Sequence, residues 1–151
     1  MKTRSELHAE LWIESRTRFV NQLKNIKEED LKKKLAPSPN SAGFLIRHIG
    51  DVEFLFAKNV FGNSDLKVSA KTVMAQHDTG EWLHLNDLLE YCQHSFEALH
   101  AIVLKQTDEN WEEIITTKEF GTKSKAEAFG RIISHTAYHA GQLAMVLKYG
   151  A

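Results

Sequence analysis

The chain has 151 residues, which suits a single domain over residues 1–151 and can bury a core without disulfides or a metal staple. Its 19 basic and 20 acidic residues give a net charge of −1, so charge gives no reason to expect a nucleic-acid partner. No apolar run approaches the roughly 20 residues that span a bilayer, and the N-terminus lacks the apolar core of a signal peptide. With a single cysteine, Cys92, no internal disulfide can form, and we expect a cytoplasmic protein without a membrane partner.

The first expected helix begins at Thr3, which forms a capping box with Glu6, and apolar residues then recur at helical spacing. The charged stretch 27–34 suggests one short helix. The two prolines of the segment LAPSPNS end it, because proline lacks an amide proton and restricts the residue before it.

A second helix is expected over residues 41–61, with Ser41 as its cap and Gly62 after its end. His48 falls inside the apolar stripe of this helix. Residues 65–85 show no clean period and are predicted to be a long connection, which in a compact domain is often functional or crosses a bundle from end to end.

A third helix fits residues 86–106, with Asn86 as its cap and Cys92 on its apolar face. The stretch 111–120 is ambiguous, because its β-branched residues favour extended backbone, and Gly121 marks a turn.

The last helix opens on a capping box of Ser124 and Glu127 and ends near Gly150. Its inner side should carry Phe129, Ile132, Thr136, Leu143 and Val146. Four amphipathic helices of comparable length predict an all-α four-helix bundle. The long connection between the second and third helices would allow those two helices to run parallel.

Three histidines form the main functional signal. His135 and His139 are four residues apart in the last helix, so both imidazoles leave the same face, the spacing at which a helix supplies two ligands to one metal ion. With His48, three neutral imidazoles would converge inside the bundle. A fourth metal position would then stay open, as catalytic metal sites require.

The alternative is that these are ordinary core histidines. Eight histidines in this length give an accidental pair four apart in roughly one sequence in three, and a lone histidine such as His48 usually bonds a carbonyl group. Three buried imidazoles would, however, leave several ring nitrogens without partners, and a metal would satisfy three at once. From the residues alone, both interpretations stay open.

Other side chains give weaker signals. Cys92 is expected to be a small, buried apolar residue. Trp12 and Trp82 fit packing roles better than ligand-binding ones. Of the two, Trp82 is the better pocket candidate because it comes from the irregular segment, and Tyr138 is the other candidate for lining a substrate or cofactor pocket. The remaining histidines carry no clear ligand pattern: His8, His77, His84, His94 and His100.

Several other chemistries lack their motifs. The chain has no glycine-rich phosphate loop, no GxSxG elbow and no ExxH pair of a di-iron centre. The segment HTAYH lacks the glutamate of the HExxH zinc-protease motif.

The order of these features resembles the DinB/YfiT-like superfamily of four-helix-bundle metalloproteins. One histidine lies in SAGFLIRHIGDVEFLF, and HTAYHAGQL follows in the last helix. The resemblance covers nearly the whole chain and maps His48, His135 and His139 onto the metal triad. Glu53 and Gln142 match positions that often hold the same residue types. Ala140 stands where an arginine is common.

The resemblance implies a divalent metal, usually zinc or nickel, and a chain that often forms a homodimer. Some relatives transfer low-molecular-weight thiols such as bacillithiol or mycothiol to electrophiles, and one branch isomerises maleylpyruvate. A metal-dependent thiol transferase acting on a small-molecule substrate is therefore the leading interpretation. The metal would hold the thiol as thiolate in its open position.

Two alternatives stay open. A metal-activated water could support hydrolysis, but the nearby carboxylates, Asp51 and Glu53, fall off the strict face of His48. The third interpretation is a non-catalytic metal-binding stress-response module, which a filled fourth position would favour. An open position that faces a pocket with Trp82 and Tyr138 would favour an enzyme.

Overall fold

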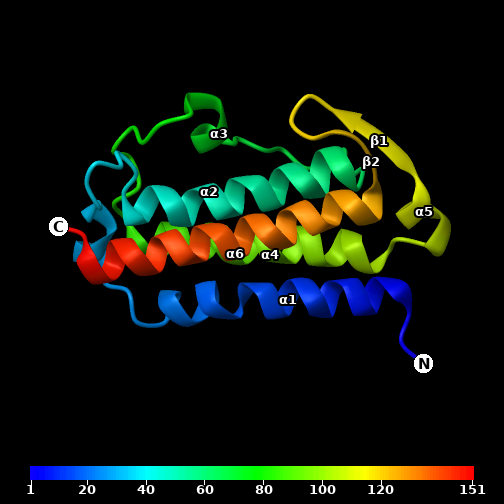
Figure 1. Ribbon diagram of the computed structural model, residues 1–151, viewed down its shortest axis with the longest axis horizontal. Helices are drawn as coiled ribbons and strands as arrows, with labels where there is room; N and C mark the ends of the chain where they lie inside the picture. Colours follow the sequence, from blue (N-terminus) through cyan, green and yellow to red (C-terminus); the bar gives the residue numbers. More distant parts are fainter.

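The computed structural model describes all 151 residues, and four long helices dominate it (Figure 1). These are α1 (Arg4–Leu23), α2 (Ala42–Leu55), α4 (Leu85–Leu104) and α6 (Lys125–Tyr149). They lie side by side along the long axis of the molecule, so the predicted four-helix bundle is confirmed. None of the helices is both long enough and apolar enough to span a bilayer.

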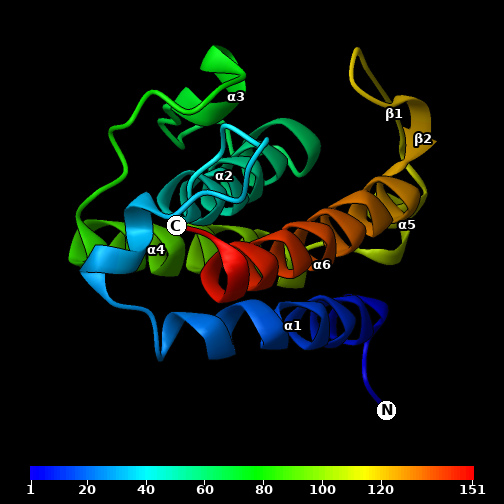
Figure 2. The same ribbon diagram turned by 60° about the vertical axis from the view of Figure 1, so that its left-hand side comes forward.

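Contacts between residues on neighbouring helices show the relative directions of the helices. On α2 and α4, the Ile46 carbonyl oxygen lies 3.5 Å from Cys92 Sγ, and Ser95 packs against Gly50 further along both helices. Residue numbers therefore increase in the same direction along both helices, so α2 and α4 run parallel, as expected. Helix α6 runs antiparallel to its neighbour α2, as Figures 1 and 2 show.

Shorter elements connect and close the bundle. The stretch after α1 forms a 3₁₀ turn, η1 (Glu28–Lys32), as the charged pattern indicated. Helix α2 continues as one π-helical turn, η2 (Phe56–Val60), and this wider turn ends where sequence predicted the helix to end. The long connection is not wholly irregular, because it contains the short helix α3 (Lys71–Ala75).

The ambiguous segment after α4 divides into two structures. A short helix, α5 (Asp108–Glu112), precedes strands β1 (Ile114–Thr117) and β2 (Gly121–Ser124). The strands pair antiparallel and form a hairpin that folds back over the end of the bundle (Figure 2). The extended backbone expected from β-branched residues is confirmed.

The caps of three long helices are those that the sequence indicated. Thr3 and Ser124 form capping boxes, and the Ser41 hydroxyl accepts a hydrogen bond from the Phe44 amide. The expected cap at Asn86 is wrong: α4 begins one residue earlier, and the extended residue before it is His84. The distant Glu28 carboxylate accepts the Leu85 amide at 3.1 Å, a contact that local pattern cannot reveal.

The core consists of two apolar clusters that follow one another along the bundle. One is built around Phe19, Ile46 and Leu143, and the other around Trp12 and Phe129. Neither cluster includes a histidine. The histidines therefore take no part in the apolar packing that joins the helices.

We expect the metal-free protein to keep its fold. Because the core is complete without an ion, treatment with a chelator should leave most of the helical circular dichroism signal, unlike in a zinc finger. Thermal unfolding should remain cooperative after chelation. Loss of the helical signal would show that the histidine cluster holds the bundle together.

Candidate metal centre

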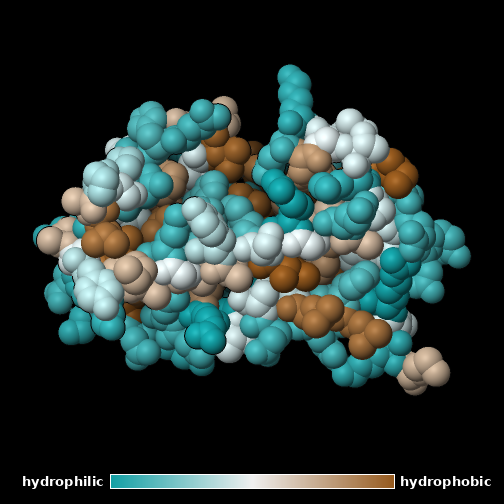
Figure 3. Space-filling view, viewed as in Figure 1, coloured by the Kyte–Doolittle hydropathy of each residue, from teal (hydrophilic) through white to brown (hydrophobic).

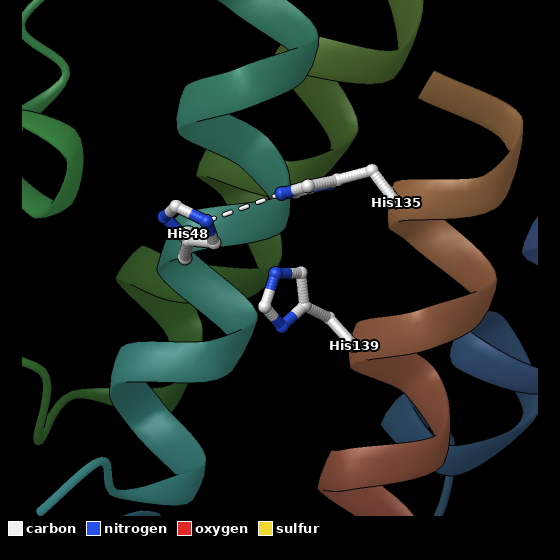
Figure 4. Close-up of side chains that lie close together, drawn as sticks. All are labelled: His48, His135 and His139. Carbon is white, nitrogen blue, oxygen red and sulfur yellow. Dashed lines mark hydrogen bonds between the residues drawn. The ribbon is translucent and has the colours of Figure 1, made fainter. Parts of the chain in front are cut away.

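The histidine cluster lies where α2 and α6 face each other. His48 comes from α2, and His135 and His139 come from consecutive turns of α6 (Figure 4). Thr136 and Ala140, each one residue further along α6, are buried. The two histidines therefore stand at the edge of the buried face, half-buried, and point across the groove toward His48.

The distances within the cluster suit one metal ion. The Nε2 atoms of His48 and His135 are 3.1 Å apart, and one ring nitrogen from each of the three residues lies within 4.8 Å of the others. Two nitrogens bound at about 2.0–2.1 Å to a tetrahedral ion would be about 3.3 Å apart. The His48–His135 pair already has this spacing, and the third nitrogen, within 4.8 Å of both, would have to move closer to bind the same ion.

A hydrogen-bonded chain fixes the orientation of His48. The Thr72 hydroxyl donates to Asp51 Oδ2 at 2.7 Å, and the Thr72 amide donates to the same oxygen. The Thr72 oxygen can then only accept, at 3.0 Å, from Nδ1–H of His48. This arrangement leaves His48 Nε2 as a free lone pair that faces the other two histidines.

Gln142 does the same for His139. Its side-chain oxygen lies 2.6 Å from His139 Nδ1 and accepts the proton there, which leaves Nε2 as the ligand atom. His135 is different, because its Nδ1 is buried without a hydrogen-bond partner. Since His48 Nε2 has no proton, His135 must donate across the 3.1 Å contact, and that proton is the one a metal would displace.

The site keeps its imidazoles neutral. Burial, together with the neighbouring His139, lowers the pKa of His48 to about 4. Burial and the two other imidazoles lower the pKa of His135 to about 3, and burial also lowers the pKa of His139. Neutral imidazole is the form that binds metals.

A change at Thr72 should weaken metal binding without unfolding the protein. Thr72→Val keeps the shape of the side chain but removes the acceptor that orients His48, so we expect metal affinity to fall about 10–100-fold. Thr72→Ser should restore most of it. Competition with a fluorescent chelator measures the affinity, and an unchanged value for Thr72→Val would refute the orienting role.

A cavity of about 290 Å³ opens beside the three histidines. Apolar side chains of α2 and η2, Val73 of α3, and the turn of the hairpin surround it. Figure 3 shows hydrophobic surface at the bottom of the hollow between the α3 segment and the hairpin. Besides the histidines, the lining residues are Val52, Leu55, Phe56, Asn59, Val60, Val73, Thr117, Glu119 and Phe120.

The two pocket candidates from sequence have different positions. Tyr138 lines an adjoining cavity of about 580 Å³ together with His135, and its ring packs edge-on against His139 at 5.1 Å. Trp82 lies elsewhere: it is buried against Gly43 at the start of α2, under the Arg47 guanidinium. Trp82 therefore acts as a packing residue and does not line the cavity of the histidines.

The neighbouring carboxylates are committed to other partners. Asp51 is fully buried and bonds Arg47, Thr72 and Tyr91, so it reaches His48 only through Thr72. Glu53 is fully buried against Arg16 and Ser95. The expectation that both carboxylates lie off the face of His48 agrees with these contacts.

Cys92 and the other histidines lie away from the cluster. Cys92 is buried in the core, and burial raises the pKa of its thiol. His94 is exposed, whereas His100 is half-buried and stacks on Phe96. His8 packs on Trp111, and His77 and His84 are exposed. None of these residues belongs to the group that could hold an ion.

Sequence reasoning missed three residues of the site. Thr72 lies in the aperiodic connection, and Glu119 and Arg131 line the cavity next to His135. Only Arg131 carries a sequence signal, since it lies four residues before His135 and therefore on the same helical face. The positions of Thr72 and Glu119 depend on tertiary contacts.

Comparison with known proteins agrees with this arrangement. A family model described as the DinB superfamily matches residues 11–143. A search of curated proteins finds no match.

Two solved structures show the same fold. A mycothiol-dependent maleylpyruvate isomerase superposes with a TM-score of 0.73 at 16% identity, over 95% of this chain. The match covers only 63% of the isomerase. A conserved protein from Enterococcus faecalis superposes with a TM-score of 0.69 at 14% identity, over 98% of this chain and 97% of that one.

Proposed function

Because the chain belongs to the DinB superfamily, we propose that it is a metal-dependent enzyme that transfers a low-molecular-weight thiol to a small electrophilic substrate. The observation that carries the proposal is the convergence of three neutral imidazoles at the bottom of an open cavity. The similar isomerase is mycothiol-dependent, which supports a thiol as co-substrate here.

The proposed metal ligands are His48, His135 and His139, with zinc or nickel as the ion. A bound divalent ion would supply the positive charge that keeps a thiol ionised at neutral pH. Thr72 and Gln142 hold two of the imidazoles in the required tautomer. Val52 and Phe56 form an apolar wall beside the place where the sulfur would form its new bond.

The nucleophile in this proposal is an added thiol and not Cys92. The Cys92 side chain is buried in the core, and the burial that raises its pKa keeps the thiol protonated and inert. Cys92 is not among the residues that line the cavity of the histidines.

Two single variants test the proposal. With metal-loaded protein and a chromogenic electrophile, Cys92→Ala should keep the thiol-dependent rate, and His139→Ala should fall to the uncatalysed rate. Size-exclusion chromatography and circular dichroism check that both variants fold. Equal rates with and without wild-type protein, for all thiols tried, would overturn the enzyme proposal and favour a metal-binding module.

Hydrolysis ranks second. It needs a general base beside a metal-bound water, and because the buried carboxylates Asp51 and Glu53 are both engaged in ion pairs, Glu119 of the cavity is the carboxylate that would serve. The thiol dependence of the similar isomerase favours thiol transfer over hydrolysis. An ester or amide substrate cleaved without any added thiol would reverse this order.

A further inference from the structure

The cavity that adjoins the histidine cluster carries one charge of each sign. Its volume is about 580 Å³, and its charged lining residues are Glu119 and Arg131. His135 and Tyr138 line the same cavity, so the two charges lie next to the proposed metal site. Glu119 also lines the smaller cavity that contains all three histidines.

Arg131 has no anionic partner. Three of the five arginines, Arg4, Arg16 and Arg47, form ion pairs, whereas the guanidinium of Arg131 forms none. Instead it lies over the ring of Phe120, 5.9 Å from the ring centre. Because Arg131 lies one helical turn before His135 on α6, its exposed side chain leaves the helix on the cavity side.

Glu119 is likewise unpaired. It lies in the turn between β1 and β2, and its exposed side chain lines the same cavity as Arg131. Its carboxylate is not within 4.0 Å of any Lys, Arg or His nitrogen, including those of Arg131. Two opposite charges therefore share one cavity without neutralising each other.

We infer that this cavity binds the zwitterionic end of an amino-acid-type thiol, with the ligand carboxylate on Arg131 and its ammonium group on Glu119. The inference rests on the proposed function, because it assumes that the thiol sulfur is directed toward the histidines. A ligand that carries only one charge would be attracted by one of the two residues and repelled by the other, whose charge has the same sign. A ligand with both charges pairs with both residues and supplies two charge-assisted hydrogen bonds.

Four thiols that share the HS–CH₂–CH₂ unit test the inference. They are homocysteine with both charges, 3-aminopropanethiol with the ammonium, 4-mercaptobutyrate with the carboxylate, and 1-propanethiol with neither. Isothermal titration of zinc-loaded protein under reducing conditions gives the four affinities, and elemental analysis afterwards verifies that zinc stays bound. Homocysteine should bind tightest, by about 10-fold for each charged group.

Variants that remove one charge of the cavity test which ligand group contacts Arg131 and which contacts Glu119. Arg131→Gln should weaken homocysteine and 4-mercaptobutyrate about 10-fold and leave 3-aminopropanethiol and 1-propanethiol unchanged. Glu119→Gln should weaken the binding of homocysteine and 3-aminopropanethiol, which carry the ammonium group, and leave 4-mercaptobutyrate and 1-propanethiol unchanged. Arg18→Gln and Glu14→Gln remove exposed, unpaired charges outside the cavity and serve as matched controls.

The outcomes separate the inference from the proposed function. Equal affinity for all four thiols would overturn the zwitterion site and leave thiol binding at the metal intact. A preference for homocysteine that survives both cavity variants would also overturn it. If no thiol binds to the zinc-loaded protein, the proposed function fails, and the inference fails with it.

Discussion

Replacing His48, His135 and His139 together by alanine should abolish metal binding. One ring nitrogen from each of these residues lies within 4.8 Å of the others, and no other group of three or more His, Cys, Asp or Glu side chains in the chain comes as close together. Removing even an outer partner of a ligand typically costs 10–100-fold in affinity, so loss of all three ligands should cost more than about 100-fold. Elemental analysis of protein purified after metal loading measures the effect.

A matched control uses three histidines outside the cluster. His77, His84 and His94 are exposed and make no contact with the cluster, so their replacement by alanine should leave metal content unchanged. Circular dichroism should show the same helical content in both triple variants, because the core contains none of the six residues. Undiminished metal in the first variant would show that the ion binds elsewhere.

The helical parts of the site could be predicted because helical geometry is local. A spacing of four residues places His135 and His139 on one face whatever the rest of the chain does. The apolar stripe around His48 likewise turns that residue inward. The bundle and the parallel α2 and α4 followed from the number of amphipathic segments and the length of one connection.

Contacts between distant segments account for what the sequence did not reveal. Thr72 orients His48 only because Asp51, 21 residues earlier, holds its hydroxyl and its amide. The start of α4 is set by Glu28, which is 57 residues from Leu85. Trp82 comes from the irregular connection, yet it packs over Gly43 and does not line the cavity of the histidines.

Glu53 matches a position where the family often carries the same residue, and the structure gives it a structural role. Its carboxylate accepts the Arg16 Nε proton at 2.6 Å and the Ser95 hydroxyl at 2.8 Å. The Glu53 side chain is 0% exposed and that of Arg16 is 8% exposed. This pair joins α1 to α2 in the middle of the bundle, between the two apolar clusters.

Glu53→Ala should therefore destabilise the protein strongly and spare the metal site. Removing one partner leaves the Arg16 charge buried without compensation, which costs about 3–5 kcal/mol of unfolding free energy. Urea denaturation measures the loss, and Glu10→Ala, which breaks the exposed pair with Lys2, should cost far less. Because Glu53 makes no contact with the histidines, the folded Glu53→Ala protein should bind metal with wild-type affinity. A stable Glu53→Ala variant that binds metal but has lost activity would instead identify Glu53 as a base and restore the case for hydrolysis.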